Sequence, residues 1–285
     1  MLIAIGLSVL TAALFGINIY FQRAALADTD PHTGALLSVA GMAGFFWLLA
    51  PWLLQPEWFT LPAFGVLLLL GLMWPAMGQS LQVLAVQRVG PALTASIGSL
   101  TPLFAVALAM VVLHEPITWY TALGIALMVA GLTLAAWAPH TGVRQFAIWA
   151  LLLPVGAALA RGLAQPIAKY GMQTIPSPYF VTLVAGSVST LLLLALRQVG
   201  QRAQRRGPRG TRLFLISGVV NGVGIFFLNT ALTHGKVALV ASIVATAPLW
   251  SLLFGAVWFK HEALTRRHLM VAVMVFMGSV LVVWR

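Results

Sequence analysis

A single arginine, Arg161, stands inside a long apolar stretch of this sequence. Its guanidinium group is always charged, and its planar fork of donors fits a carboxylate or a phosphate. A cation at the centre of a membrane-spanning helix costs roughly 2.5–3.5 kcal/mol, so it should face a cavity or a partner. Arg161 therefore predicts a binding site for an anionic group on a small-molecule substrate. The alternative is a structural arginine that is bonded to backbone carbonyl groups or that extends along the helix toward the membrane surface.

Uncharged amide side chains form a second group of candidate binding residues. Gln165 follows Arg161 by four residues, so the two share one face of a helix. The amides either line a polar cavity or hold neighbouring helices together by hydrogen bonds. The predicted substrate-binding amides are Asn18, Gln79, Gln82, Gln165, Asn221 and Asn229.

Three tryptophans, Trp47, Trp74 and Trp250, lie within apolar stretches and not at their ends. Tryptophan usually gathers at the membrane–water interface. These three are therefore predicted to wall or gate a substrate cavity, with packing against other helices or lipid as the alternative.

Two prolines, Pro102 and Pro248, occupy matching positions within apolar stretches. Proline removes a backbone hydrogen bond and kinks a helix. Paired breaks near the membrane midplane suit a carrier that changes shape. We predict that both prolines act as hinges, and the alternative is a static kink.

The acidic residues all lie at the ends of predicted spans: Asp28, Asp30, Glu57, Glu115 and Glu262. A proton-coupled carrier usually keeps a titratable group at depth, and Arg161 does not titrate. The pattern predicts a facilitator or exchanger, with Glu115 and Glu262 capping or pairing at helix turns. We identify no catalytic residue, metal cluster or cofactor motif, and the chain has no cysteine. An enzyme is therefore not predicted.

Composition places these residues in a membrane. The 285 residues are 61% hydrophobic and 7% charged, whereas a soluble domain carries about 25% charged residues. Apolar blocks approaching 20 residues match the thickness of a bilayer, where helices satisfy their own backbone hydrogen bonds. The net charge of +11 does not indicate nucleic acid, because six of the sixteen basic residues cluster between Arg197 and Arg212 beside a predicted span.

The sequence predicts an all-α integral membrane protein with ten transmembrane helices. The first, 2–26, is interpreted as a true span and not as a cleaved signal peptide. The predicted spans are 2–26, 33–54, 61–87, 92–113, 117–137, 146–170, 178–197, 211–233, 237–259 and 264–284.

An internal repeat divides the chain. Residues 92–103 read ALTASIGSLTPL and residues 238–249 read ALVASIVATAPL, with seven of twelve positions identical at an offset of 146. We predict two homologous five-helix halves, 1–140 and 141–285. An odd number of spans inserts the second half upside down, which gives inverted repeats.

The distribution of basic residues predicts the orientation. With the amino terminus outside, twelve Lys and Arg residues face the cytoplasm and three face outward. Since cytoplasmic loops carry the excess of positive charge, both termini are predicted to lie outside, in the periplasm.

The repeated segments carry a recognisable motif. It runs Ala95-Ser96, Thr101-Pro102, His114-Glu115, Gly124 and Gly131 in the first half, and Ala241-Ser242, Ala247-Pro248, His261-Glu262 and Gly278 in the second. The chain thereby resembles the EamA-type family of the drug/metabolite transporter superfamily. Arg161 departs from the family pattern, which usually has an aromatic or small residue there.

The resemblance implies a carrier in the bacterial inner membrane that exports amino acids or organic anions. Substrate would cross by alternating access through a central cavity between the two halves. A monomer would suffice, and a dimer remains possible. The alternative function is efflux of drugs or other hydrophobic cations, which Arg161 and the lack of a carboxylate at depth disfavour.

Overall fold

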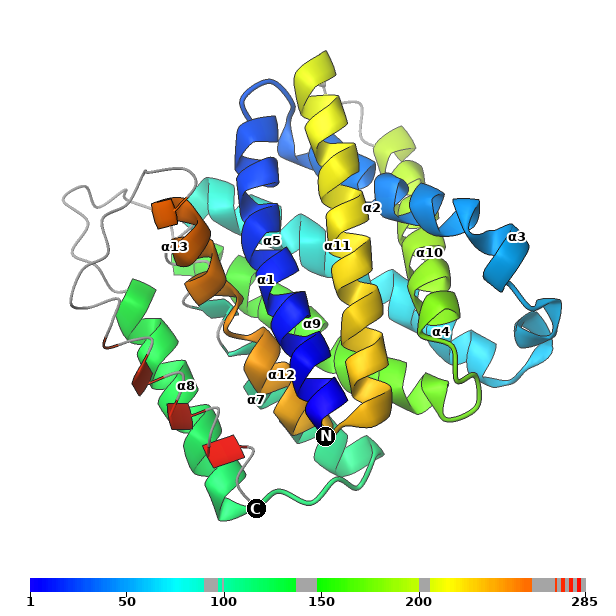
Figure 1. The fold of residues 1–285 in the computed structure, drawn as a ribbon. Helices are drawn as coiled ribbons and strands as arrows, with labels where there is room; N and C mark the ends of the chain where they lie inside the picture. Colours follow the sequence, from blue (N-terminus) through cyan, green and yellow to red (C-terminus); the bar gives the residue numbers. More distant parts are fainter. Residues whose placement is uncertain are drawn as a thin grey trace.

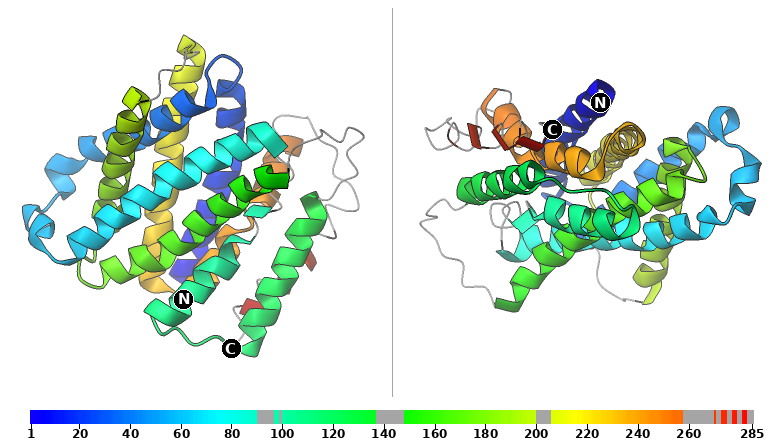
Figure 2. Two further views of the ribbon diagram at one scale, coloured as in Figure 1. Left: turned by 180° about the vertical axis from the view of Figure 1, so that it is seen from behind. Right: turned by 90° about the horizontal axis from the view of Figure 1, so that it is seen from below.

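The structure is a computed structural model that describes residues 1–89, 97–98, 100–136, 148–199 and 206–257, together with 270, 273–274, 277–278 and 281–282. Regular structure in these residues is helical, apart from an isolated β-bridge between Thr29 and Arg206. The helices form a bundle in which α1 (Leu2–Ala25) and α11 (Pro208–His234) lie side by side on one face (Figure 1). On the opposite face α5 (Gly78–Val89) lies beside α9 (Leu152–Met172) (Figure 2).

Local sequence sets the start of the second helix. Asp30 precedes α2 (Pro31–Leu48), and its carboxylate accepts a hydrogen bond of 3.0 Å from the backbone N–H of Thr33. This is the usual cap for an unpaired helix N–H group, and proline is well suited to the first helical position. The predicted span 33–54 is completed by a separate short helix, α3 (Ala50–Leu53), which is followed by the 3₁₀ helix η1 (Pro56–Thr60).

The third predicted span is broken in the middle. It consists of α4 (Ala63–Gly71), a π-helical segment η2 (Leu72–Met77) and α5. Trp74 adopts an extended backbone with φ −143° and ψ 131°, because the proline ring of Pro75 disfavours the helical region for the residue before it. Ser189 of α10 (Pro178–Val199) pairs with two backbone groups at the break. Its hydroxyl accepts a hydrogen bond from the N–H of Ala76 at 3.0 Å and donates one to the carbonyl of Gly71 at 2.6 Å.

The fourth and ninth predicted spans are also interrupted. The remaining described helices are α7 (Thr101–Val112), α8 (Trp119–Ala136), η3 (Ile148–Leu151), α12 (Val237–Val244) and α13 (Ala247–Val257). Pro102 and Pro248 lie in the first turns of α7 and α13, each directly after a point where the helix is broken. Proline is tolerated there because the N–H it lacks would be unpaired anyway. Their action as hinges stays a prediction.

Six described stretches are long and apolar enough to cross a membrane. They are Leu2–Ala25, Ala63–Ala85, Trp149–Met172, Pro178–Arg197, Pro208–His234 and Val237–Gly255. Two shorter apolar helices, Thr101–Val112 and Trp119–Gly131, fall within the fourth and fifth predicted spans. The predicted span 264–284 lies outside the described residues except at isolated positions, as does Glu262. The count of ten spans therefore stays a prediction.

One close helix crossing occurs twice. A Cβ atom added to Gly16 of α1 would come 2.8 Å from the Cβ of Trp250 in α13. A Cβ atom added to Gly162 of α9 would come 2.7 Å from the Cβ of Phe104 in α7. In both cases the backbone of the facing helix is almost as close. The two glycines are 146 positions apart, and so are their two partners, which is the offset of the sequence repeat.

Candidate functional site: a cationic pocket

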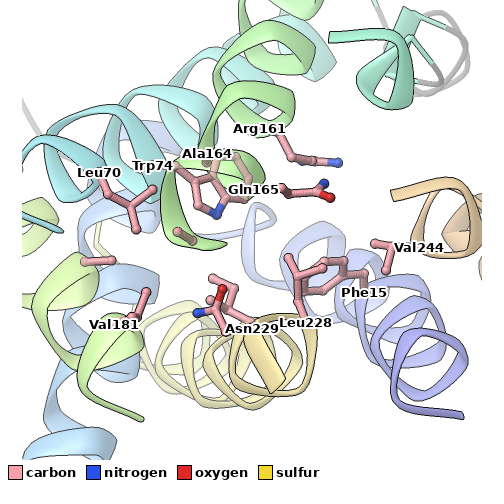
Figure 3. Close-up of a pocket in the computed structure, with 13 residues that line it drawn as sticks. Phe15, Leu70, Trp74, Arg161, Ala164, Gln165, Val181, Leu228, Asn229 and Val244 are labelled. Carbon is pink, nitrogen blue, oxygen red and sulfur yellow. The ribbon is translucent and has the colours of Figure 1, made fainter. Parts of the chain in front are cut away.

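A narrow pocket lies in the interior of the bundle, and its cavity volume of about 20 Å³ is enough for roughly one water molecule. Figure 3 shows side chains from α1, α4, α9, α10, α11 and α12 around it, together with Trp74 from η2. The lining residues are Phe15, Leu70, Trp74, Arg161, Ala164, Gln165, Ala168, Val181, Ala185, Ile225, Leu228, Asn229 and Val244.

Arg161 supplies the only charge among these lining residues. Its Nη2 donates a hydrogen bond to Oε1 of Gln82 on α5. Its guanidinium carbon lies 4.9 Å from the ring centroid of Trp74, a cation–π contact. The break before Pro75 places Trp74 in the pocket wall, so the π-helical segment η2 supplies one of the two contacts of the cation. Both partners are uncharged, and in the described part of the chain no carboxylate forms a salt bridge with Arg161.

Two polar atoms at the pocket lack hydrogen-bond partners within the described structure. They are Nε of Arg161, which is a donor, and Oε1 of Gln165, which is an acceptor. Gln165 is only 3% exposed, and burying an unpaired polar atom is costly. Figure 3 shows the two side chains extending next to each other from α9. A ligand with an anionic group and a nearby N–H or O–H would satisfy both atoms.

The opposite side of the pocket is mainly apolar. Asn229 is its polar exception, and its Nδ2 donates to Oγ1 of Thr182 at 3.1 Å. Sequence reasoning missed the apolar lining residues, because apolar side chains do not stand out in so hydrophobic a chain. For one of them the internal repeat offers a signal. Phe15 lies 146 positions before Arg161, so the two residues occupy equivalent places in the two halves, and both line the pocket.

The structure gathers only part of the predicted site. Arg161, Gln165, Trp74 and Asn229 line the pocket, and Gln82 contacts it through Arg161. Three predicted amides are not part of the lining: Asn18 and Gln79 are buried elsewhere, and Asn221 is half-buried. A position in an apolar stretch reveals that a polar side chain is unusual, but not toward which neighbour it turns.

Two of the three predicted tryptophans also lie away from the pocket. Trp47 is 48% exposed, and its Nε1 donates to Oγ of Ser187 at 2.9 Å. Trp250 packs against α1 at Gly16 and against Phe254, with ring centroids 6.1 Å apart. Neither side chain walls this pocket, and Trp74 alone of the three does.

Glu115 has the structural role that the sequence predicts. Its Oε1 accepts from Nζ of Lys169 at 2.7 Å, and its Oε2 accepts from the backbone N–H of Val237 at 2.8 Å. The carboxylate therefore both pairs with a cation and caps a helix. The matching residue of the second half, Glu262, lies outside the described residues.

Comparison with known proteins yields a family and a fold. The sequence profile of the EamA-like transporter family matches this chain twice, over residues 2–137 and 148–284. A solved crystal structure of a protein aligns with a TM-score of 0.78 at 15% sequence identity, covering 99% of this chain and 98% of that one. At this identity the likeness shows the fold alone. A search of curated proteins found no significant match.

Proposed function

This chain belongs to the EamA-like transporter family of the drug/metabolite transporter superfamily, and on that premise we propose that it exports a small metabolite bearing a carboxylate, either an amino acid or an organic anion. Membership makes the chain a multi-pass membrane transporter. The observation that carries the narrower proposal is Arg161, a charge at the pocket held only by uncharged partners in the described structure.

A bound carboxylate would complete the surroundings of Arg161. The free Nε can donate to one carboxylate oxygen, and such charge-assisted hydrogen bonds are about twice as strong as neutral ones. The low dielectric of a buried site strengthens them further. Oε1 of Gln165 would accept from an amino or hydroxyl group of the same ligand. The two atoms together favour a small polar head group.

The rest of the pocket favours a ligand with an apolar body. Leu70, Val181 and Leu228 face the space across from Arg161 (Figure 3). A sugar phosphate would leave hydroxyl groups unpaired against these side chains, which costs binding free energy. An amphipathic carboxylate matches both sides of the pocket.

We propose that the carrier has ten spans arranged as two inverted halves, 1–140 and 141–285, and alternates access across the bacterial inner membrane. The two family matches divide at the same region as the proposed halves. The close crossing of α1 with α13 recurs as that of α9 with α7, with each residue shifted by 146. Both observations support an internal two-fold relation. The breaks before Pro102 and Pro248 are the proposed bending points.

A binding screen of the purified protein in detergent tests the role of Arg161. The panel contains amino acids, organic acids, sugar phosphates and cationic dyes, and thermal unfolding is the readout. A ligand at 100 times its Kd adds about 2.7 kcal/mol of stability. We expect carboxylates to stabilise the wild type. Arg161→Gln should lower their affinity roughly 10–100-fold, because the variant loses a hydrogen bond between charged groups, and the loss of such a bond has an effect of this size.

Arg209→Gln is the matched control. It makes the same chemical change at an exposed arginine in the first turn of α11, and it should respond to ligands like the wild type. Stabilisation by cationic dyes alone would instead support efflux of hydrophobic cations. A carboxylate that stabilises Arg161→Gln as strongly as the wild type would show that Arg161 is structural.

A further inference from the structure

A second charged cluster joins three chain segments outside the pocket. Glu115 follows α7, Lys169 lies in the last turn of α9, and Gly235 and Val237 flank the start of α12. Each oxygen of Glu115 has its own donor, Nζ of Lys169 or the backbone N–H of Val237. Nζ of Lys169 also donates to the carbonyl of Gly235 at 2.6 Å. One carboxylate and one ammonium thus hold the ends of α7, α9 and α12 together.

The cluster is well placed electrostatically. Both charged side chains are mostly shielded, with exposures of 22% for Lys169 and 13% for Glu115, so solvent screens their attraction less than that of a surface pair. Glu115 lies at the amino end of α12 and Lys169 near the carboxyl end of α9. These are the helix ends that favour a negative and a positive charge respectively.

Two of the joined helices run from this cluster to the pocket. Lys169 follows Arg161 by eight residues on α9, about 12 Å along the helix axis. Similarly, α12 begins beside Glu115 and carries Val244, which lines the pocket. Figure 1 shows α7 and α12 close together, and α12 packs against both α7 and α9. The cluster therefore joins, at this end of the bundle, the two helices that carry Arg161 and Val244 of the pocket wall.

We propose that Glu115 and Lys169 form a latch that holds this end of the pocket closed, and that the end opens when Glu115 releases its two donors. The latch regulates the transport pathway, so it rests on the proposed function. It is a separate device from the substrate site, because Glu115 and Lys169 do not line the pocket.

Glu115→Gln weakens the latch with almost no change in shape. A carboxylate has two acceptor oxygens, whereas an amide has one oxygen and an NH₂ group. The amide of this variant could therefore satisfy Lys169 or the N–H of Val237, but not both. Lys169→Met removes the ion pair and leaves the cap on α12, so it tests the same latch by another route.

Spin-label distances measure the opening directly. The chain has no cysteine, so two introduced cysteines carry the labels without background. Trp119→Cys at the start of α8 and Gln173→Cys after α9 replace exposed residues, and each follows one latch residue, Glu115 or Lys169, by four positions. Double electron–electron resonance on the full chain in detergent, without ligand, gives the distance between them.

The expected result is a second, longer distance in Glu115→Gln and in Lys169→Met. Loss of one hydrogen bond to a charged group should raise the open-to-closed ratio roughly tenfold or more. Glu57→Gln changes an exposed carboxylate in η1 in the same way and should keep the wild-type distance. If Glu115→Gln does not fold, the distance distribution of Lys169→Met tests the proposal.

An unchanged distance distribution in a folded latch variant would overturn the proposal. Because no ligand is present, this outcome says nothing about Arg161. Conversely, failure of Arg161→Gln to alter ligand binding would leave the distance result intact. The two proposals therefore fail separately.

Discussion

Arg161 contacts the amide of Gln82 and the indole of Trp74, which are both uncharged. A charge introduced at Gln82 should therefore have a strong effect on Arg161. The Gln82 oxygen already lies where a competing carboxylate would sit. A negative charge placed there would act on Arg161 without altering the packing of α5 against α9, and so would mimic the carboxylate of the proposed substrate.

Gln82→Glu should block ligand binding and preserve the fold. The new carboxylate would pair with the guanidinium group and occupy donors that a substrate needs. We expect at least a roughly tenfold loss of affinity for carboxylate ligands and a Tm equal to or above that of the wild type. Isothermal titration calorimetry and thermal unfolding measure the two quantities.

Gln82→Leu is the companion variant, since it removes the amide and adds no charge. It should lower Tm, because it leaves a donor of Arg161 unpaired, and still bind carboxylates. Equal affinities in Gln82→Glu and the wild type would contradict an anion site at Arg161.

A polar or charged side chain stands out in an apolar stretch of sequence, and this explains which pocket residues the sequence could predict. Arg161 and Gln165 are conspicuous in an apolar background, and both line the pocket. Phe15 and Leu228 are ordinary in a chain that is 61% hydrophobic, and nothing local distinguishes them. Asn18 is the converse case, because it is unusual in its span but lies outside the lining of this pocket. The rotation of a helix against its neighbours decides such cases.

At the scale of the helices, a proline does not by itself decide where a span breaks, because Pro166 lies within the continuous helix α9. Pro75 implies a distortion of the third span. That Trp74 then lies under the guanidinium group of Arg161 depends on how η2 packs against α9. Likewise, the ninth predicted span is divided into α12 and α13, and α1 packs against both parts. Tertiary contacts supply this information.

The repeated crossing gives a prediction for two glycines. Gly16→Ala and Gly162→Ala should each destabilise the protein by about 1–3 kcal/mol, the usual cost of overpacking. In both cases the added methyl group would press on the Cβ atom and backbone of the facing helix, which cannot rotate away. Thermal unfolding in detergent measures the loss.

Gly6→Ala is the control on α1, because nothing lies within 4 Å of the added carbon. Alanine is a better helix former than glycine by about 1 kcal/mol, so Tm should hold or rise. A neutral Gly162→Ala beside a destabilised Gly16→Ala would show that the two crossings are not equivalent.

For the whole molecule, composition alone indicated a helical membrane protein, and the repeated motif indicated the family, which the profile match confirms. Long apolar runs identify spans because a bilayer demands them. The pairing of α1 with α11, and of α2 with α10, is not encoded in any local pattern. It follows from which faces fit together.

Orientation is testable with the same cysteine-free background. We expect Gln173→Cys, after α9, to react with a membrane-impermeant maleimide in intact cells. Arg209→Cys, at the start of α11, should react only after permeabilisation. The reason is the excess of Lys and Arg on the predicted cytoplasmic side. The reverse labelling pattern would place both termini in the cytoplasm.

The lone positive charge of Arg161 also has an electrical consequence. With a monoanion bound, the proposed site crosses the membrane neutral, and it returns empty with one positive charge. Moving one charge through the membrane potential is worth about 2.3 kcal/mol per 100 mV, and a negative interior pulls the empty return inward. Export of a monoanion would then draw on the voltage without any titratable group. A zwitterion would leave the charge of Arg161 unbalanced in both directions and gain no such bias.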